Sequence, residues 1–63
     1  MDKTYIYMLS IYNNGKYQWQ CGPYTLGEAL RSAHIYDGLK HKQAVVWDSE
    51  TGEDVYKSIL ADA

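Results

Sequence analysis

The segment Thr25-Leu26-Gly27-Glu28-Ala29-Leu30-Arg31-Ser32-Ala33-His34-Ile35-Tyr36 predicts an α-helix, and the remaining segments are read around it. Thr25 followed by Glu28 has the form of a capping box, in which each side chain accepts a hydrogen bond from the other residue's backbone N–H. Gly38 is expected to end the helix in a left-handed conformation. Ile35 projects away from the apolar stripe, so it lies either under the next loop or in a contact. The stripe itself, spaced at the helical repeat, consists of Leu26, Ala29, Leu30, Ala33 and Tyr36.

The residues before this helix predict a β-hairpin. Residues 4–12 are rich in aromatic and β-branched side chains, which favours a strand, and residues 17–21 alternate in character as a return strand. Asn14-Gly15 lies between them and is a strong signal for a type I′ turn, because both central residues of that turn need positive φ. Gly22-Pro23 is expected to stop the second strand.

The residues after the helix predict a second hairpin. Residues 43–47 are expected to form a strand, and residues 54–58 an edge strand whose charges suit an exposed position. In the loop between them, the Asp48 side chain can accept hydrogen bonds from N–H groups two or three residues on, and Gly52 is expected at positive φ.

This order of elements predicts an α+β fold of the ββαββ type in a single domain spanning residues 1–63. The helix carries the chain back along the sheet, so that the third strand can pair antiparallel with the first. The expected sheet has four antiparallel strands in the order 2-1-3-4, with the helix on one face. No element then remains to cover the other face.

The register of the first hairpin predicts which side chains share a face. A two-residue turn places Tyr12 opposite Tyr17 and Met8 opposite Cys21, and directly opposed residues lie on the same face. The helix is therefore expected to cover Ile6, Met8, Ser10, Tyr12, Tyr17, Trp19 and Cys21. An exposed apolar patch usually marks a binding surface. The candidate residues for contact with a protein partner, or for a homodimer interface, are Tyr5, Tyr7, Leu9, Ile11, Gln18 and Gln20.

Composition argues against several classes of function. The single cysteine cannot form an intrachain disulfide, which is typical of a reducing cytoplasm. The net charge of -2, with six Lys and Arg spread along the chain, provides no basic stripe for nucleic acid. No apolar run approaches the ~18 residues of a membrane span, and residues 1–3 lead into a strand pattern rather than a signal peptide. We therefore expect a cytoplasmic protein.

The sequence contains no recognisable catalytic or metal-binding set. Cys21 is expected on the core face as an inert thiol, and neither His34 nor His41 has a partnered nucleophile in the pattern. The spacing of these three residues matches no metal motif, so we expect no cofactor and assign no catalytic residue. Carboxylates gather at the second hairpin, where solvated turn residues are the simpler interpretation. An alternative is contact with a basic partner through Glu50, Glu53 and Asp54.

The whole chain is similar in style to very small phage-encoded proteins that bind and block host machinery, anti-CRISPR proteins among them. The resemblance is one of architecture and is carried by the strand 5–12, the helix 25–36 and the closing hairpin 44–53. It implies stoichiometric inhibition by binding, without catalysis. The alternative is a protein that sequesters a small molecule or nucleotide: seven Tyr and two Trp rings offer stacking surfaces, and Arg31, Lys40 or Lys42 could meet phosphate.

Overall fold

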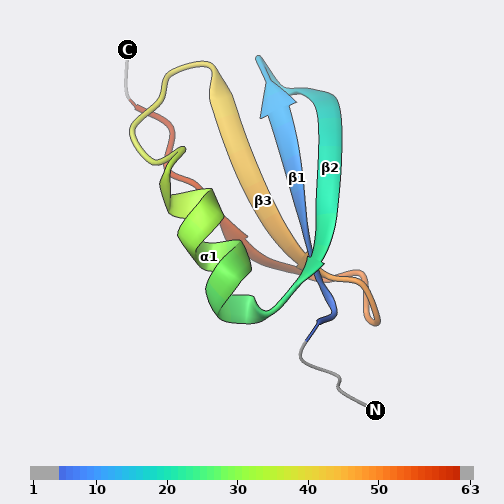
Figure 1. Cartoon of the computed structure of the whole chain (residues 1–63). Coiled ribbons are helices and arrows are strands. Elements are labelled where there is room, and N and C mark those ends of the chain that lie inside the picture. The colour runs from blue at the N-terminus through green and yellow to red at the C-terminus, as the bar shows by residue number, and fades with distance from the viewer. Residues whose placement is uncertain (1–4, 62–63) are drawn as a thin grey trace.

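A computed structural model describes residues 5–61, which form four β-strands and one α-helix. The elements are β1 (Tyr7–Asn13), β2 (Lys16–Tyr24), α1 (Leu26–His34), β3 (Lys42–Asp48) and β4 (Asp54–Lys57). The strands pair antiparallel in one sheet of order β2-β1-β3-β4, and α1 packs on one face (Figure 1). The predicted ββαββ architecture is confirmed. Within residues 5–61, no helix is both long and apolar enough to cross a membrane.

The helix begins at the predicted capping box. The Thr25 hydroxyl accepts a hydrogen bond from the Glu28 N–H, and the Glu28 carboxylate accepts one from the Thr25 N–H, each at 3.2 Å. These contacts satisfy two donors that a helix N-terminus would otherwise leave open. The helix ends at His34, two residues before the predicted end, and the chain continues in turns to Gly38, which has the expected positive φ of 86°.

The core lies between α1 and the two central strands. β1 contributes Leu9 and Ile11, which are each 3% exposed, and small side chains from α1 and β3 complete the buried set. Because alanines on α1 and β3 leave little side-chain bulk between the backbones, the helix can lie close to the sheet. The remaining buried core residues are Ala29, Ala33, Ala44 and Val46, and the side chains that pack around them are Tyr7, Cys21, Tyr24, Leu30, Tyr36 and Tyr56.

The helix covers the face opposite to the predicted one. Leu9 and Ile11 were expected on the uncovered face, but they lie in the core, and Tyr7 packs against them. Met8 and Tyr12, which alternate with these residues along β1, therefore lie on the uncovered face. The prediction was wrong because β1 is apolar on both faces, so its alternation does not show which face the helix occupies.

β2 also departs from the predicted register, through an extra residue. Tyr12 pairs with Tyr17 as expected, but Ile11 pairs with Trp19, so that Gln18 forms a bulge. A bulge of one residue reverses the alternation of the strand beyond it. Cys21 consequently pairs with Leu9 rather than with Met8, and its thiol packs against the core.

The second strand does not stop at Gly22-Pro23. β2 continues through both residues to Tyr24, which pairs with Tyr7 across a second irregularity in the register. The prediction that these two residues end the strand is therefore wrong. The strand tolerates Pro23 because β2 is an edge strand, which needs backbone hydrogen bonds on one side only.

Candidate functional site

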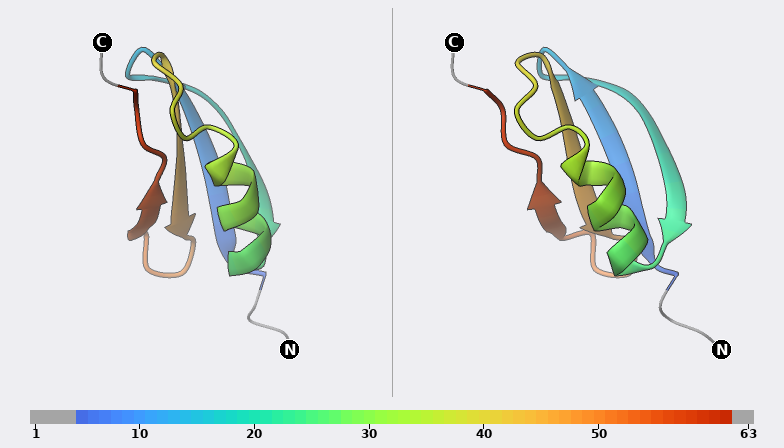
Figure 2. Two further views of the ribbon diagram at one scale, coloured as in Figure 1. Left: turned by 90° about the vertical axis from the view of Figure 1, so that its left-hand side faces the viewer. Right: turned by 60° about the vertical axis from the view of Figure 1, so that its left-hand side comes forward.

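The face of the sheet opposite α1 is the candidate site, and we call it the open face. Figure 2 shows α1 on one side of the sheet, and no helix or strand among residues 5–61 lies over the other side. Because paired residues share a face, the strand register identifies the side chains that belong to it. They are Met8, Ser10, Tyr12, Tyr17, Gln20, Gln43, Val45, Trp47, Asp54 and Lys57.

The indole of Trp47 lies across the middle of the open face. Trp47 pairs with Met8, but its Nε1–H donates a hydrogen bond of 2.8 Å to the hydroxyl oxygen of Ser10, two residues further along β1. Ser10 is 4% exposed and Val45 is 7% exposed, although no helix or strand among residues 5–61 covers this face. The centre of the open face is therefore shielded by its own side chains. Because the indole N–H of Trp47 is already hydrogen-bonded to Ser10, Trp47 offers its ring, and not this N–H, to another molecule.

A second pair of aromatic rings lies where β1 meets β2. Tyr12 and Tyr17 are directly opposed, and their rings pack edge to face with centroids 6.0 Å apart. Such pairs contribute about 0.5–1.5 kcal/mol beyond the area they bury. Tyr12 is half-buried in this arrangement, whereas Tyr17 is 53% exposed. Tyr17 is thus an anchored ring that still presents much of its surface to another molecule.

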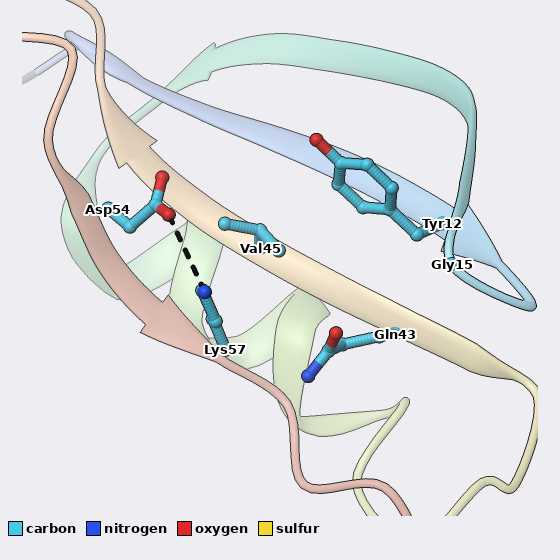
Figure 3. A pocket seen from close by; sticks show the side chains of 6 residues that line it. All are labelled: Tyr12, Gly15, Gln43, Val45, Asp54 and Lys57. Atoms are coloured by element: carbon cyan, nitrogen blue, oxygen red, sulfur yellow. Dashed lines mark ion pairs between the residues drawn. The ribbon is translucent and has the colours of Figure 1, made fainter.

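The open face is hollowed beside Tyr12. The hollow has a volume of about 200 Å³, and side chains from β1, β3 and β4 surround it (Figure 3). Pockets that enclose small ligands usually measure ~300–1,000 Å³, so this hollow is closer in size to one side chain of a partner. Its lining residues are Tyr12, Gly15, Gln43, Val45, Asp54 and Lys57.

The charges on the open face nearly cancel. Lys57 and Asp54 form an ion pair with 3.9 Å between Nζ and Oδ2, and both side chains are exposed. Exposed pairs of this kind contribute little to stability. The amide of Gln43 donates to the carbonyl of Ser58 at 2.9 Å and is turned towards the C-terminal tail. Recognition at this face would therefore depend on rings and shape more than on net charge.

The six residues that the sequence predicted for partner contact are dispersed. Leu9 and Ile11 are core residues, and Tyr7 is half-buried beside them, so these three do not form an outer surface. Tyr5 precedes β1 and is 52% exposed. Gln18 and Gln20 are exposed in β2, and Gln20 lies on the open face opposite Ser10.

The sequence prediction missed Val45 and Trp47 of β3 as members of the uncovered face, and placed Met8, Ser10 and Tyr12 beneath the helix. One signal could have corrected this. Ile11 pairs with Ala44, and a small residue in the sheet is the natural counterpart of the alanines on the helix stripe. Matching small residues across the layers would have placed Ile11 and Ala44 together in the core.

The acidic hairpin has the predicted turn chemistry. Asp48 Oδ1 accepts hydrogen bonds from the N–H groups of Glu50, at 2.8 Å, and Thr51, at 3.3 Å, and Gly52 has a φ of 79°. Glu50 and Glu53 are exposed in this loop. Of the three proposed acidic contacts, only Asp54 has a register position on the open face.

A separate polar cluster surrounds Asp37, outside the open face. Its carboxylate accepts hydrogen bonds from the Tyr56 hydroxyl and the Ile59 N–H, each at 2.9 Å, and lies 2.8 Å from His34 Nδ1. The contact with His34, followed by that with Ile59, lowers the pKa of Asp37. Burial and the neighbouring carboxylate raise the pKa of Tyr56. The cluster joins α1, β4 and the C-terminal tail; among the described residues, no three His, Cys, Asp or Glu side chains gather closely enough to hold a metal ion.

Neither a protein-family model, nor a curated protein, nor a solved structure matches this chain.

Proposed function

We propose that this chain is a non-enzymatic protein-binding module whose open face contacts a protein partner. At a finer level, we propose a cytoplasmic inhibitor from a phage or mobile element, which blocks a bacterial defence or regulatory complex by stoichiometric binding. The observation that carries the proposal is the open face itself. A four-stranded sheet presents Tyr12, Tyr17 and Trp47 on a side that no described element covers.

The chemistry of these rings supports a protein interface. The exposed face of a small antiparallel sheet is usually polar, whereas Tyr and Trp are enriched at the centres of protein–protein contacts. The hollow beside Tyr12 would accept one projecting side chain, as pockets in such interfaces do. The hydrogen bond from Trp47 to Ser10 and the packing of Tyr17 on Tyr12 hold the rings in place before binding, which reduces the entropy lost on association.

The size of the open face favours a foreign partner over a homodimer. Four strands about 4.8 Å apart and roughly seven residues long cover about 19 × 23 Å, or roughly 900 Å² counted on both partners. Stable interfaces usually bury about 1,200–2,000 Å². A second copy stacked face to face would fall below this range, whereas a larger protein can extend contacts beyond the sheet. The homodimer suggested by the sequence is therefore the weaker form of the proposal.

Two tyrosines with nearly equal exposure provide a matched test. Tyr17 on the open face is 53% exposed and Tyr5 outside it is 52% exposed. Partners are captured from bacterial lysate with three tagged proteins: the wild type, Tyr17→Ala and Tyr5→Ala. Each protein is also assayed for its ability to inhibit a bacterial defence system that targets plasmids. We expect Tyr17→Ala to lose at least about tenfold in partner recovery, consistent with removal of an aromatic anchor from an interface, and Tyr5→Ala to match the wild type.

Equal recovery by both variants would contradict the use of the open face. Loss of partner recovery in both variants would contradict the restriction of binding to the open face. Light scattering on the purified chain tests the homodimer separately, because a stable dimer that Tyr17→Ala converts to monomer would assign the open face to self-association instead.

The sequestration of a nucleotide is a second candidate, favoured by one observation. The Tyr12 ring and the Lys57 ammonium group both line the hollow on the open face, on opposite sides of Val45 (Figure 3), so that a base and a phosphate could be met together. Arg31, which the sequence proposed for phosphate contact, lies instead on α1. A thermal-shift screen with nucleotides tests this candidate. A rise in Tm that Lys57→Ala removes would support it, and an unchanged Tm would count against it.

A further inference from the structure

A cluster of exposed aliphatic side chains lies at the C-terminal end of α1, away from the open face. Ile35 is 74% exposed and Ile59 is 66% exposed, the two largest exposed fractions of any large apolar side chain among residues 5–61. Leu39 and Leu60 are also exposed. We call these four residues, Ile35, Leu39, Ile59 and Leu60, the aliphatic cluster. Exposed apolar groups of this kind mark interaction surfaces when they are contiguous.

Backbone contacts bring the two halves of the cluster together. The Gly38 N–H donates to the carbonyl of Ile59 at 2.7 Å, and the Ala61 N–H donates to the carbonyl of Leu39 at 3.1 Å. The loop after α1 and the C-terminal tail therefore run side by side although they are distant in sequence, as Figure 1 shows. The hydrogen bond from the Ile59 N–H to Asp37 adds a third tie. The cluster thus rests on a tethered backbone.

The part of the aliphatic cluster around Leu39 has basic neighbours. A hollow of about 360 Å³ is lined by Leu39 together with Lys40, His41 and Lys42. The carbonyl of His41 accepts a hydrogen bond from the Asn14 N–H at 2.7 Å, and Nδ1 of the His41 ring lies 3.0 Å from Oδ1 of Asn14. The loop is therefore anchored to the β1–β2 turn. Two lysines therefore lie beside Leu39, a member of the aliphatic cluster, in a chain whose net charge is -2. Asp62, which follows the tail, lies outside the described residues.

We propose that this surface binds an acidic amphipathic segment of a partner protein. Aliphatic side chains on such a segment would pack on Ile35 and Ile59, and its carboxylates would meet Lys40 and Lys42. The combination of apolar contact with opposite charge matches the way amphipathic helices are recognised, and charge complementarity would set the orientation and the rate of association. This surface is separate from the open face and does not depend on the function proposed for it.

An anionic membrane is the less favoured occupant. Clusters that recognise anionic lipids usually contain about four to eight Lys and Arg, and interfacial segments usually add Trp or Phe. The aliphatic cluster has two neighbouring lysines, no aromatic member, and an overall acidic chain around it. These features favour a protein segment.

The test uses a fluorescent synthetic peptide with Leu and Glu at helical spacing, and the same peptide with Lys in place of Glu. Binding to the full chain is measured by fluorescence anisotropy at about 50 mM salt, where charges are only partly screened. We expect the acidic peptide to bind and the basic peptide not to. Reversal of both lysine charges (Lys40→Glu with Lys42→Glu) should weaken binding of the acidic peptide at least about tenfold, because like charges then face one another. The same change should allow the basic peptide to bind.

The matched control reverses two lysines elsewhere, Lys16→Glu with Lys57→Glu, and should leave the acidic peptide bound. The double variant Ile35→Ser with Ile59→Ser should also weaken binding of the acidic peptide. Circular dichroism should show an unchanged fold, because both positions are exposed. The proposal is overturned if the acidic peptide fails to bind, if both charge reversals act alike, or if vesicles of anionic lipid bind where the peptide does not. Tyr17→Ala should not alter peptide binding, which separates this surface from the open face.

Discussion

Asp37 joins three parts of the chain through one carboxylate. It accepts hydrogen bonds from Tyr56 of β4 and from the N–H of Ile59 in the tail, and it lies 2.8 Å from the ring of His34 at the end of α1. The tail that carries part of the aliphatic cluster is thereby attached to the helix. A single ionised group therefore supports both the local fold and the placement of a proposed binding surface.

The lowered pKa of Asp37 predicts a specific pH dependence. A carboxyl group whose pKa is lower in the folded than in the unfolded state stabilises the fold above its ordinary pKa of about 4, and this stabilisation is lost as the pH falls through the folded pKa. Asp37→Asn should lower the Tm at pH 7 and should show a smaller further loss of Tm between about pH 5 and pH 2.5 than the wild type. Thermal unfolding followed by circular dichroism measures both.

Asp54→Asn is the control for this experiment, because the partner of Asp54 among residues 5–61 is Lys57, in an exposed ion pair at 3.9 Å. It should retain the pH dependence of the wild type. If Asp37→Asn has the same acid dependence as the wild type, the Asp37 carboxylate does not hold the tail in the manner described.

At the level of elements, β2 determines how the first hairpin meets the helix. Its bulge at Gln18 turns Cys21 towards the core, and its second irregularity passes through Gly22 at a φ of 127°. A Cβ atom at Gly22 would lie 3.0 Å from both the Met8 sulfur and the Tyr7 carbonyl oxygen. Glycine is needed there for its positive φ and because β1 and β2 approach closely.

Gly22→Ala should therefore destabilise the fold by about 1–3 kcal/mol, the usual cost of a strained backbone position. Gly27→Ala is the matched control: Gly27 lies in α1, and an added Cβ would meet only the end of the Arg31 side chain, at 4.0 Å. That change should stabilise the helix by about 0.5–1 kcal/mol. Urea unfolding of both variants measures the two effects, and equal effects of the same sign would refute this role for Gly22.

Local signals predicted the elements well because each depends on nearby residues. The capping box at Thr25, the Asn14-Gly15 turn and the Asp48 turn are all present as expected. The covered face was not predicted, because it depends on the side of the sheet that the helix crosses, and β1 is apolar on both faces. β2 and β3 are parallel, with β1 between them, and such crossovers favour one hand. That handedness was a second available signal for the covered face, beside the pairing of Ile11 with Ala44.

The candidate site was predicted in kind but not in residues. An uncovered sheet face with aromatic side chains was expected and is present, yet it is built on Ser10, Tyr12 and Trp47 rather than on Leu9 and Ile11. The alternation along β1 was predicted correctly, but the helix was assigned to the wrong side of the sheet, so the covered and uncovered side chains of β1 were exchanged. The aliphatic cluster could not be predicted as a unit, because it depends on hydrogen bonds between the loop after α1 and the C-terminal tail.

For the molecule as a whole, the small core and the open face have a common origin. The described part of this 63-residue chain has one helix, which can bury one face of the sheet, and the other face is left to side chains that shield one another. This shielding comes from the hydrogen bond between Trp47 and Ser10 and from the packing of Tyr17 on Tyr12. The same rings give the molecule a preformed, nearly neutral surface, which is the one that we propose for a protein partner.

The most direct test of the open face is an NMR titration of the isotope-labelled chain with the protein it captures. Binding through the open face predicts shifts in the amide signals of Tyr12, Tyr17 and Val45 and in the indole N–H signal of Trp47, with the signals of α1 unchanged. Shifts concentrated in α1, with the open-face signals unmoved, would contradict the proposed function.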